Sequence, residues 1–360
     1  MKRLFAQQDW QYPIYAINCD APDTQKAGCY GQPKPEMYQA LPVSKISKKW
    51  NVCVSFPTLK DPYWVAVNAG LAKEAKRDNV KMTILSAGSY NNLSTQVNQL
   101  QNCVANGAEA IIVGAISYSG LDAQLQSYVK KGIVVIDAWN GLSLPDVSSH
   151  ALIDYFISGG EAAKYLMKVA KQAGRPLNVA VLPGPAGAGW SERTAAGFKK
   201  ALEGQSDVKV VGVKYGDTGQ DTQLELAQNV LQTYKDVDWI FANAPGATQA
   251  AVAIKQANKA SKVRVIASYT TPAVYEGVKS GDIACVANDQ TVGYSRIAMD
   301  LAVRKLEKQP AFGDLQRIWA LPRPIVICGD SAGKGQNNLD QFVYDASLFP
   351  PGFKPTLNVG

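Results

Sequence analysis

From about residue 49 onward, short apolar runs alternate with segments of helical periodicity, and this alternation limits the possible folds more than any other feature of the chain. The runs are apolar on both faces, which is typical of a parallel sheet covered by helices. The first series predicts strands at 51–56, 80–87, 110–114 and 133–138, with helices at 63–77, 93–106 and 121–130.

A second series follows the turn-rich segment 139–145. It predicts helices at 159–173, 191–202, 223–233, 247–257, 275–279 and 293–305, and strands at 177–182, 209–214, 239–242, 263–268, 283–287 and 324–328. Two such series predict an α/β fold of two doubly wound parallel-sheet lobes. No low-complexity linker separates them, so we expect a hinge of about three crossovers, near Ala138, Asp289 and Leu321.

These crossovers divide the chain into lobes that share segments. The predicted parts are an N-terminal extension at 1–47, an N-terminal lobe at 48–138 plus 291–320, a C-terminal lobe at 139–290 plus 321–345, and a C-terminal tail at 346–360. A chain of 360 residues, of which 46% are hydrophobic, is long enough to bury two cores.

The composition argues against most catalytic classes. His150 is the only histidine, and its neighbours offer neither a metal-ligand spacing nor an evident catalytic base. We therefore expect a binding protein and not an enzyme, with no catalytic residues, no metal and no cofactor. The net charge of +7 is spread thinly, and the first 48 residues show no helix-turn-helix, so we expect no nucleic-acid partner.

No apolar run approaches the roughly 20 residues that cross a bilayer, so we expect no direct membrane insertion. The basic start at Met1–Phe5 has no apolar segment behind it, and a signal peptide is not visible.

Six cysteines occur without a CxxC pair, which disfavours zinc. We favour a disulfide between Cys19 and Cys29, because the stretch between them is too polar to order itself by burial. Pairings of Cys53 with Cys103 and of Cys285 with Cys328 are weaker expectations, because buried free thiols are equally ordinary there. A disulfide would imply an oxidising compartment such as the periplasm.

Ligands of open parallel sheets bind beyond the carboxyl ends of the strands, and these positions are rich in aromatic residues. Electron-rich ring faces around one cleft attract a cation, so together they predict an aromatic cage, whereas any one ring could equally fill the core. The expected ring residues are Tyr63, Trp64, Tyr90, Trp139, Tyr155, Trp190 and Tyr269.

Three polar residues complete the candidate site. Asp61 and Asp289 could neutralise a positive ligand centre, or each could cap the helix that follows it. Asn140 could donate to a ligand oxygen, or could form an Asx-turn beside Gly141. The segment from Pro183 to Trp190 lacks the phosphate-loop motifs and predicts a close-approach loop that ends at Trp190.

The residues from Cys53 to Trp64, together with Gly88–Tyr90, Gln101–Cys103, Gly107–Ile111, Pro183–Pro185 and Pro351–Phe353, carry a family resemblance. Over about residues 50 to 355 the chain resembles the TorT family of periplasmic sensors of trimethylamine N-oxide. More broadly, it is similar to the type I periplasmic binding proteins of the ribose-binding and LacI-like kind. Rings and an amide stand where the sugar binders typically carry charged residues, at Trp139, Asn140 and Tyr269, which argues against a sugar.

The resemblance implies a cage of Tyr63, Trp64, Tyr155 and Tyr269, with Asp61 and Asp289 as polar partners. It also implies a periplasmic protein that captures a small quaternary-amine-like solute, with trimethylamine N-oxide as the best guess. Lobe closure would present the bound state to the periplasmic domain of a membrane sensor histidine kinase. The alternative is the substrate-binding component of an ABC transporter, which delivers a sugar, polyol or other small solute to a permease.

Overall fold

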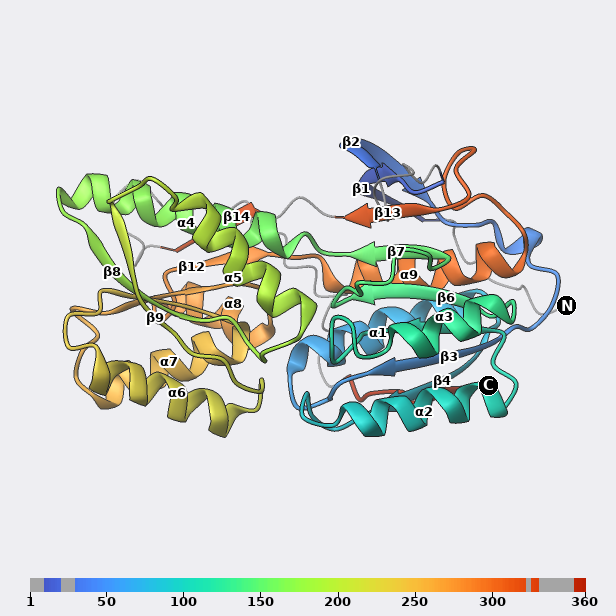
Figure 1. Ribbon diagram of the computed structural model, residues 1–360, viewed down its shortest axis with the longest axis horizontal. Helices are drawn as coiled ribbons and strands as arrows, with labels where there is room; N and C mark the ends of the chain where they lie inside the picture. Colours follow the sequence, from blue (N-terminus) through green and yellow to red (C-terminus); the bar gives the residue numbers. More distant parts are fainter. Residues whose placement is uncertain (1–9, 21–29, 322–324, 330–352) are drawn as a thin grey trace, which may run out of the picture.

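The computed structural model describes residues 10–20, 30–321, 325–329 and 353–360 and has two lobes side by side, each built on its own sheet (Figure 1). Two mixed α/β sheets of mainly parallel strands, covered by helices, confirm the predicted fold class. None of the helices in these ranges is long and apolar enough to cross a membrane.

The N-terminal lobe holds nine strands in the order β15-β4-β3-β5-β6-β7-β13-β1-β2. Their bounds are β1 Gln11–Asn18, β2 Tyr30–Gln39, β3 Asn51–Phe56, β4 Lys81–Ser86, β5 Ala110–Val113, β6 Val134–Trp139, β7 Ser149–Leu152, β13 Ile318–Leu321 and β15 Asn358–Val359. The strands β4, β3, β5, β6, β7 and β13 run parallel, whereas β1, β2 and β15 extend the two edges with antiparallel pairs.

The C-terminal lobe holds six strands in the order β14-β12-β11-β10-β8-β9. Their bounds are β8 Leu177–Leu182, β9 Val208–Val213, β10 Trp239–Ala242, β11 Arg264–Ala267, β12 Cys285–Asn288 and β14 Ile325–Cys328. All of these strands are parallel except β14, which pairs antiparallel with β12.

Helices cover both faces of each sheet. Their bounds are α1 Pro62–Arg77, α2 Leu93–Ala105, α3 Asp122–Lys130, α4 Tyr155–Ala173, α5 Gly189–Ala201, α6 Gln220–Thr233, α7 Ala244–Gln256, α8 Pro272–Ser280 and α9 Thr291–Leu306, with a short 3-10 turn at Val43–Lys45. In the N-terminal lobe, α1 and α9 pack on one face and α2 and α3 on the other. In the C-terminal lobe, α6 to α8 cover one face, and α4 and α5 cover the other.

Sheet membership differs from the predicted lobe boundaries at β7. The prediction placed everything from residue 139 to 290 in the C-terminal lobe, but β7 pairs with β6 and β13 in the N-terminal sheet. The chain therefore first crosses between the sheets after Leu152 and not near Ala138. A strand of Ser, His, Ala and Leu has no apolar run to reveal it, and it is held by its two parallel neighbours.

The described residues near both ends of the chain also join the N-terminal sheet instead of forming a separate extension and tail. The hairpin β1–β2 pairs with β13, and β15 pairs with β4. Polar contacts fasten the hairpin to the helices: Trp10 donates to Glu74 of α1, and Tyr38 donates to Asp300 of α9. Partners so distant in sequence give no local signal, which explains why the prediction missed these strands.

Two of the predicted disulfides are confirmed. Cys53 of β3 is bonded to Cys103 of α2, and Cys285 and Cys328 join register partners on β12 and β14. Cys19 is also disulfide-bonded, but Cys29, its predicted partner, lies outside the described residues.

Candidate functional site

Eight of the ten predicted site residues line one small cavity between the lobes; we call them the cage. The cage consists of Asp61, Tyr63, Trp64, Tyr90, Asn140, Tyr155, Trp190 and Tyr269. Each follows a strand or opens a helix at the edges of the sheets that face each other, and none is more than 7% exposed. The centre of a water molecule can occupy only about 10 Å³ of the cavity, so it has room for about one water molecule and a ligand must be small or must spread the rings.

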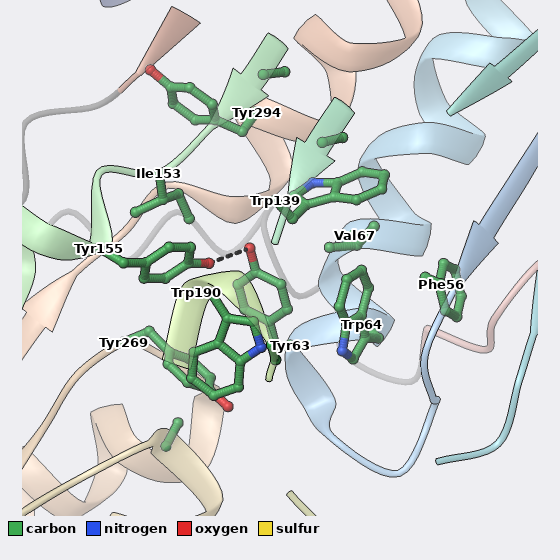
Figure 2. Packing of buried hydrophobic residues seen from close by; sticks show 14 of the residues in the cluster. Phe56, Tyr63, Trp64, Val67, Trp139, Ile153, Tyr155, Trp190, Tyr269 and Tyr294 are labelled. Atoms are coloured by element: carbon green, nitrogen blue, oxygen red, sulfur yellow. Dashed lines mark hydrogen bonds between the residues drawn. The ribbon is translucent and has the colours of Figure 1, made fainter. Parts of the chain in front are cut away.

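Rings of the cage meet edge to face, both within one lobe and from one lobe to the other (Figure 2). The ring of Tyr63 lies 5.3 Å from Tyr269 and nearly perpendicular to it, and Trp190 lies 5.8 Å from Tyr269. The hydroxyls of Tyr63 and Tyr155 are 3.4 Å apart. Ring faces that border an enclosed space attract a positive centre.

Asp61 is the carboxylate of the cage, and it both caps a helix and faces the site. Its Oδ1 accepts from the backbone N–H of Tyr63 at the start of α1, as expected of an N-cap. Its Oδ2 accepts from the hydroxyl of Tyr269 in the other lobe at 2.5 Å. Burial raises the pKa of Asp61 to about 6, because removing water disfavours the charged form. The helix-capping role is therefore confirmed, and neutralisation of a positive ligand centre stays a prediction.

Tyr90 supplies a hydrogen-bond donor to the cage. Its oxygen accepts from Asn140 Nδ2 at 3.1 Å and from Trp190 Nε1 at 3.0 Å. The hydroxyl proton of Tyr90 has no acceptor among the described residues. Asn140 also donates to the carbonyl of Ala115, so its amide positions Tyr90. A ligand oxygen in the cavity would find this phenol ready to donate.

Trp139 and Asp289 do not line the cage, contrary to the prediction. The backbone of Trp139 is left-handed, with φ of 62°, which turns its ring to the α1 and α9 face, where it contacts Trp64 and donates to Ser295. Asp289 accepts from the backbone N–H of Thr270 behind the cage. Burial raises the pKa of Asp289 to about 7. Burial also raises the pKa of Tyr63 and Tyr155, and the nearby charge of Asp289 adds to that rise.

Two contacts that join the lobes were not predicted. Ser89, beyond β4, donates to Asp217 beyond β9 at 2.6 Å, and the backbone N–H of Tyr118 donates to the carbonyl of Gly187 at 2.9 Å. The only feature of the sequence that could have indicated these contacts is that their residues follow predicted strands. Both contacts hold the lobes together beside the cage.

Ser89→Ala is expected to shift the protein toward a more open arrangement, because it removes a hydrogen bond to a carboxylate that only the closed form makes, worth about 1–2 kcal/mol. Small-angle X-ray scattering should show a larger radius of gyration than in the wild type. Ser280→Ala, whose hydroxyl bonds only within its own surface turn, is the control. Equal radii for Ser89→Ala and the wild type would contradict the role given to this contact.

Among the described residues, one acidic group has metal-like spacing, but it is occupied by arginines. It consists of Glu74, Asp78 and Asp300. Arg77 and Arg296 contact Glu74, Arg77 also contacts Asp78, and Arg304 contacts Asp300. Three carboxylates facing three guanidinium groups form a structural network and give no reason to invoke a metal.

Most of the chain is similar to known proteins. Residues 52–310 match the periplasmic binding protein domain family. The periplasmic protein TorT of Escherichia coli (strain K12) is 32% identical over 317 residues, which cover 88% of this chain and 87% of that protein.

Two solved structures are similar along most of the chain. An ABC transporter solute binding protein from Bradyrhizobium sp. BTAi1 with bound bis-tris is 38% identical, with a TM-score of 0.70, over 96% of this chain and 98% of that one. TorT in complex with the TorS sensor domain in the presence of TMAO is 26% identical, with a TM-score of 0.71, over 86% of this chain and 100% of that one.

Proposed function

This chain belongs to the periplasmic binding protein family, and from that premise we propose that its cage captures a small quaternary-amine-like solute, with trimethylamine N-oxide as the first candidate. It is a periplasmic solute-binding protein similar to TorT, and its homologues are binding and sensor proteins, not enzymes. We further propose that the ligand-bound form is presented to the periplasmic domain of a membrane sensor histidine kinase.

The observation that carries this proposal is the enclosure of one cavity by six aromatic rings and one carboxylate. Ring faces stabilise a desolvated methylated nitrogen by about 0.5–2 kcal/mol each. Tyr90 can donate to an N-oxide oxygen, and Asp61 faces the positive nitrogen. A sugar, in contrast, needs many hydrogen bonds, and few free donors and acceptors line this cavity.

Ligand-dependent closure provides a physical route to signalling. The cage combines side chains of the N-terminal lobe with Tyr155, Trp190 and Tyr269 of the C-terminal lobe, so a bound solute contacts both. A ligand shifts an equilibrium only by its difference in affinity between the two arrangements, and contacts from both lobes exist only when these are closed. The surface of the closed form would then be read by the partner.

The second candidate function, delivery to an ABC permease, is favoured by the relative from Bradyrhizobium, which is described as an ABC transporter solute binding protein. Its bound bis-tris is an amine, so this alternative changes the partner more than the chemistry of the site. Two experiments separate these functions. Solute-dependent co-purification with a kinase periplasmic domain would support the sensor, whereas loss of solute uptake in cells that lack the protein would support the transporter component.

Isothermal titration with trimethylamine N-oxide, betaine, choline and ribose is expected to show saturable binding of the methylated amines and none of ribose. Trp64→Ala and Tyr269→Ala should each weaken binding by about tenfold or more, because each removes a ring face, and Tyr269→Ala also leaves Asp61 without its partner.

Trp50→Ala serves as the matched control for the loss of a large ring. Trp50 stands just before β3, at the opposite end of that strand from the cage, where it donates to Glu307. Its replacement should leave the affinity unchanged, and thermal melts should establish that all variants are folded. Binding of ribose alone, with equal affinity in the cage variants, would refute the proposal.

A further inference from the structure

A second cavity of about 220 Å³ adjoins the cage; we call it the side cavity. Asn140 and Tyr155 line both cavities, so these two side chains form a shared wall. Tyr118 and Arg193 lie at its outer side, and each side chain is 41% exposed. The side cavity thus lies between the cage and solvent.

Three polar residues lie in one row along a wall of the side cavity. Asp137 of β6 is the register partner of His150 on β7, and His150 is the register partner of Trp319 on β13. Neighbouring strands are about 4.8 Å apart, and register partners point to the same face, so these side chains are close neighbours. All three residues line the side cavity.

The row leaves one acceptor and one donor without a partner. Asp137 Oδ2 accepts from the backbone N–H of Leu142 and lies 3.0 Å from His150 Nδ1. Asp137 Oδ1 and Trp319 Nε1 are both buried and have no hydrogen-bond partner among the described residues. Leaving such groups unpaired costs free energy, so this wall favours an occupant that satisfies both.

A hydroxyl group meets that requirement. A hydroxyl can donate to an acceptor such as Asp137 Oδ1 and can accept from a donor such as Trp319 Nε1, whereas a carboxylate has no proton to donate and an ammonium cannot accept from the indole N–H. Arg193, the cation at the outer side, is already engaged with Asp154 at 3.4 Å.

We propose that the side cavity binds the hydroxylated arm of an amine whose methylated head occupies the cage. This inference rests on the proposed function and narrows its substrate class to amino alcohols that carry a quaternary or tertiary nitrogen. Asn140 and Tyr155 stand between the two cavities, so their side chains must move aside for the arm to pass. The lone histidine then has a positioning role, because it holds the carboxylate of Asp137 in the row.

Matched pairs of ligands test the proposal. Choline and its longer hydroxyalkyl homologues are titrated into the protein beside alkyltrimethylammonium ions of equal length that lack the hydroxyl. At the arm length that reaches the side cavity, the hydroxylated ligand should bind up to about tenfold more tightly, which is the effect of one or two well-placed hydrogen bonds.

Trp319→Phe and Asp137→Asn should each reduce this preference, measured in the same variant as the ratio of affinities of the hydroxylated ligand and its alkyl partner of equal length. Trp50→Phe is the control, and Trp319→Phe keeps the test valid if Asp137→Asn fails to fold. Equal affinity of both ligand series in the wild type would overturn the inference and leave the proposed function intact. Failure of every ammonium ligand to bind would overturn both.

Discussion

Asp300→Ala is expected to lower the free energy of unfolding by about 3–5 kcal/mol, which is the usual cost of removing one partner from a buried ion pair. Asp300 lies in α9 and is fully buried. It accepts from the hydroxyl of Tyr38, the backbone N–H of Leu41 and Nε of Arg304, at 2.5 to 2.7 Å. Its loss leaves the guanidinium of Arg304 without its carboxylate and leaves two neutral donors unpaired in the interior.

Urea denaturation followed by circular dichroism measures this loss. Glu276→Ala removes an exposed carboxylate that faces Lys279, and should change stability by less than about 0.5 kcal/mol. Because Tyr38 belongs to β2, hydrogen exchange in the β1–β2 hairpin should also accelerate in Asp300→Ala. If Asp300→Ala were as stable as Glu276→Ala and the β1–β2 hairpin kept its protection from hydrogen exchange, the hydrogen bonds of Asp300 would not be what fastens the hairpin.

The second large effect is a fall in stability as the pH rises, caused by the two buried carboxylates at the site. Burial raises the pKa of Asp61 to about 6 and that of Asp289 to about 7, both from an ordinary value of 3.8. Between the ordinary and the raised pKa, the folded protein holds a proton that the unfolded chain has lost, so stability falls as the pH rises through this window.

Between pH 5 and pH 8 the unfolded chain has already lost both protons. The folded state keeps the proton of Asp61 up to its pKa of about 6, which is about one pH unit, and that of Asp289 up to about 7, which is about two pH units. At about 1.4 kcal/mol per unit, the two groups together should lower the free energy of unfolding by about 4 kcal/mol. Urea denaturation at both pH values, on the wild type and on Asp61→Asn/Asp289→Asn, measures their share. The raised pKa values of Glu74 and Asp78 lower stability with rising pH in the wild type and in the double variant alike. The difference in pH dependence between the two proteins therefore gives the contribution of Asp61 and Asp289.

The double variant should therefore lose less stability over this pH range than the wild type and should be the more stable protein at pH 8. Identical pH profiles would mean that the two carboxylates ionise in the folded state as they do in water. The two carboxylates would then carry their negative charge throughout this pH range.

The same ionisation separates two ligand chemistries. A quaternary cation favours the charged carboxylates, so its affinity should rise with pH through the same window. An N-oxide also presents an oxygen that accepts hydrogen bonds, which Tyr90 or a protonated carboxyl group can donate, so its affinity should depend less on pH.

The sequence by itself determined the two-lobed α/β fold and most of the candidate site. Strand and helix periodicities are local properties, and parallel strands place their carboxyl ends on one edge, so reading the residues after each strand was enough to group Tyr63, Tyr90 and Tyr269. The disulfides Cys53–Cys103 and Cys285–Cys328 were the weaker expectations, because a free buried thiol is ordinary in an apolar element, and the structure confirms both.

Only the tertiary structure decided which side chains face the cavity and which segments complete the sheets. Trp139 follows a strand as predicted, but its left-handed backbone turns its ring away, and a single φ angle leaves no trace in the periodicity. The strand β7, the β1–β2 hairpin and the bond between Ser89 and Asp217 depend on partners far away in sequence, and no local pattern reports such pairings. The row of Asp137, His150 and Trp319 is of the same kind, because strand register alone brings its three members together.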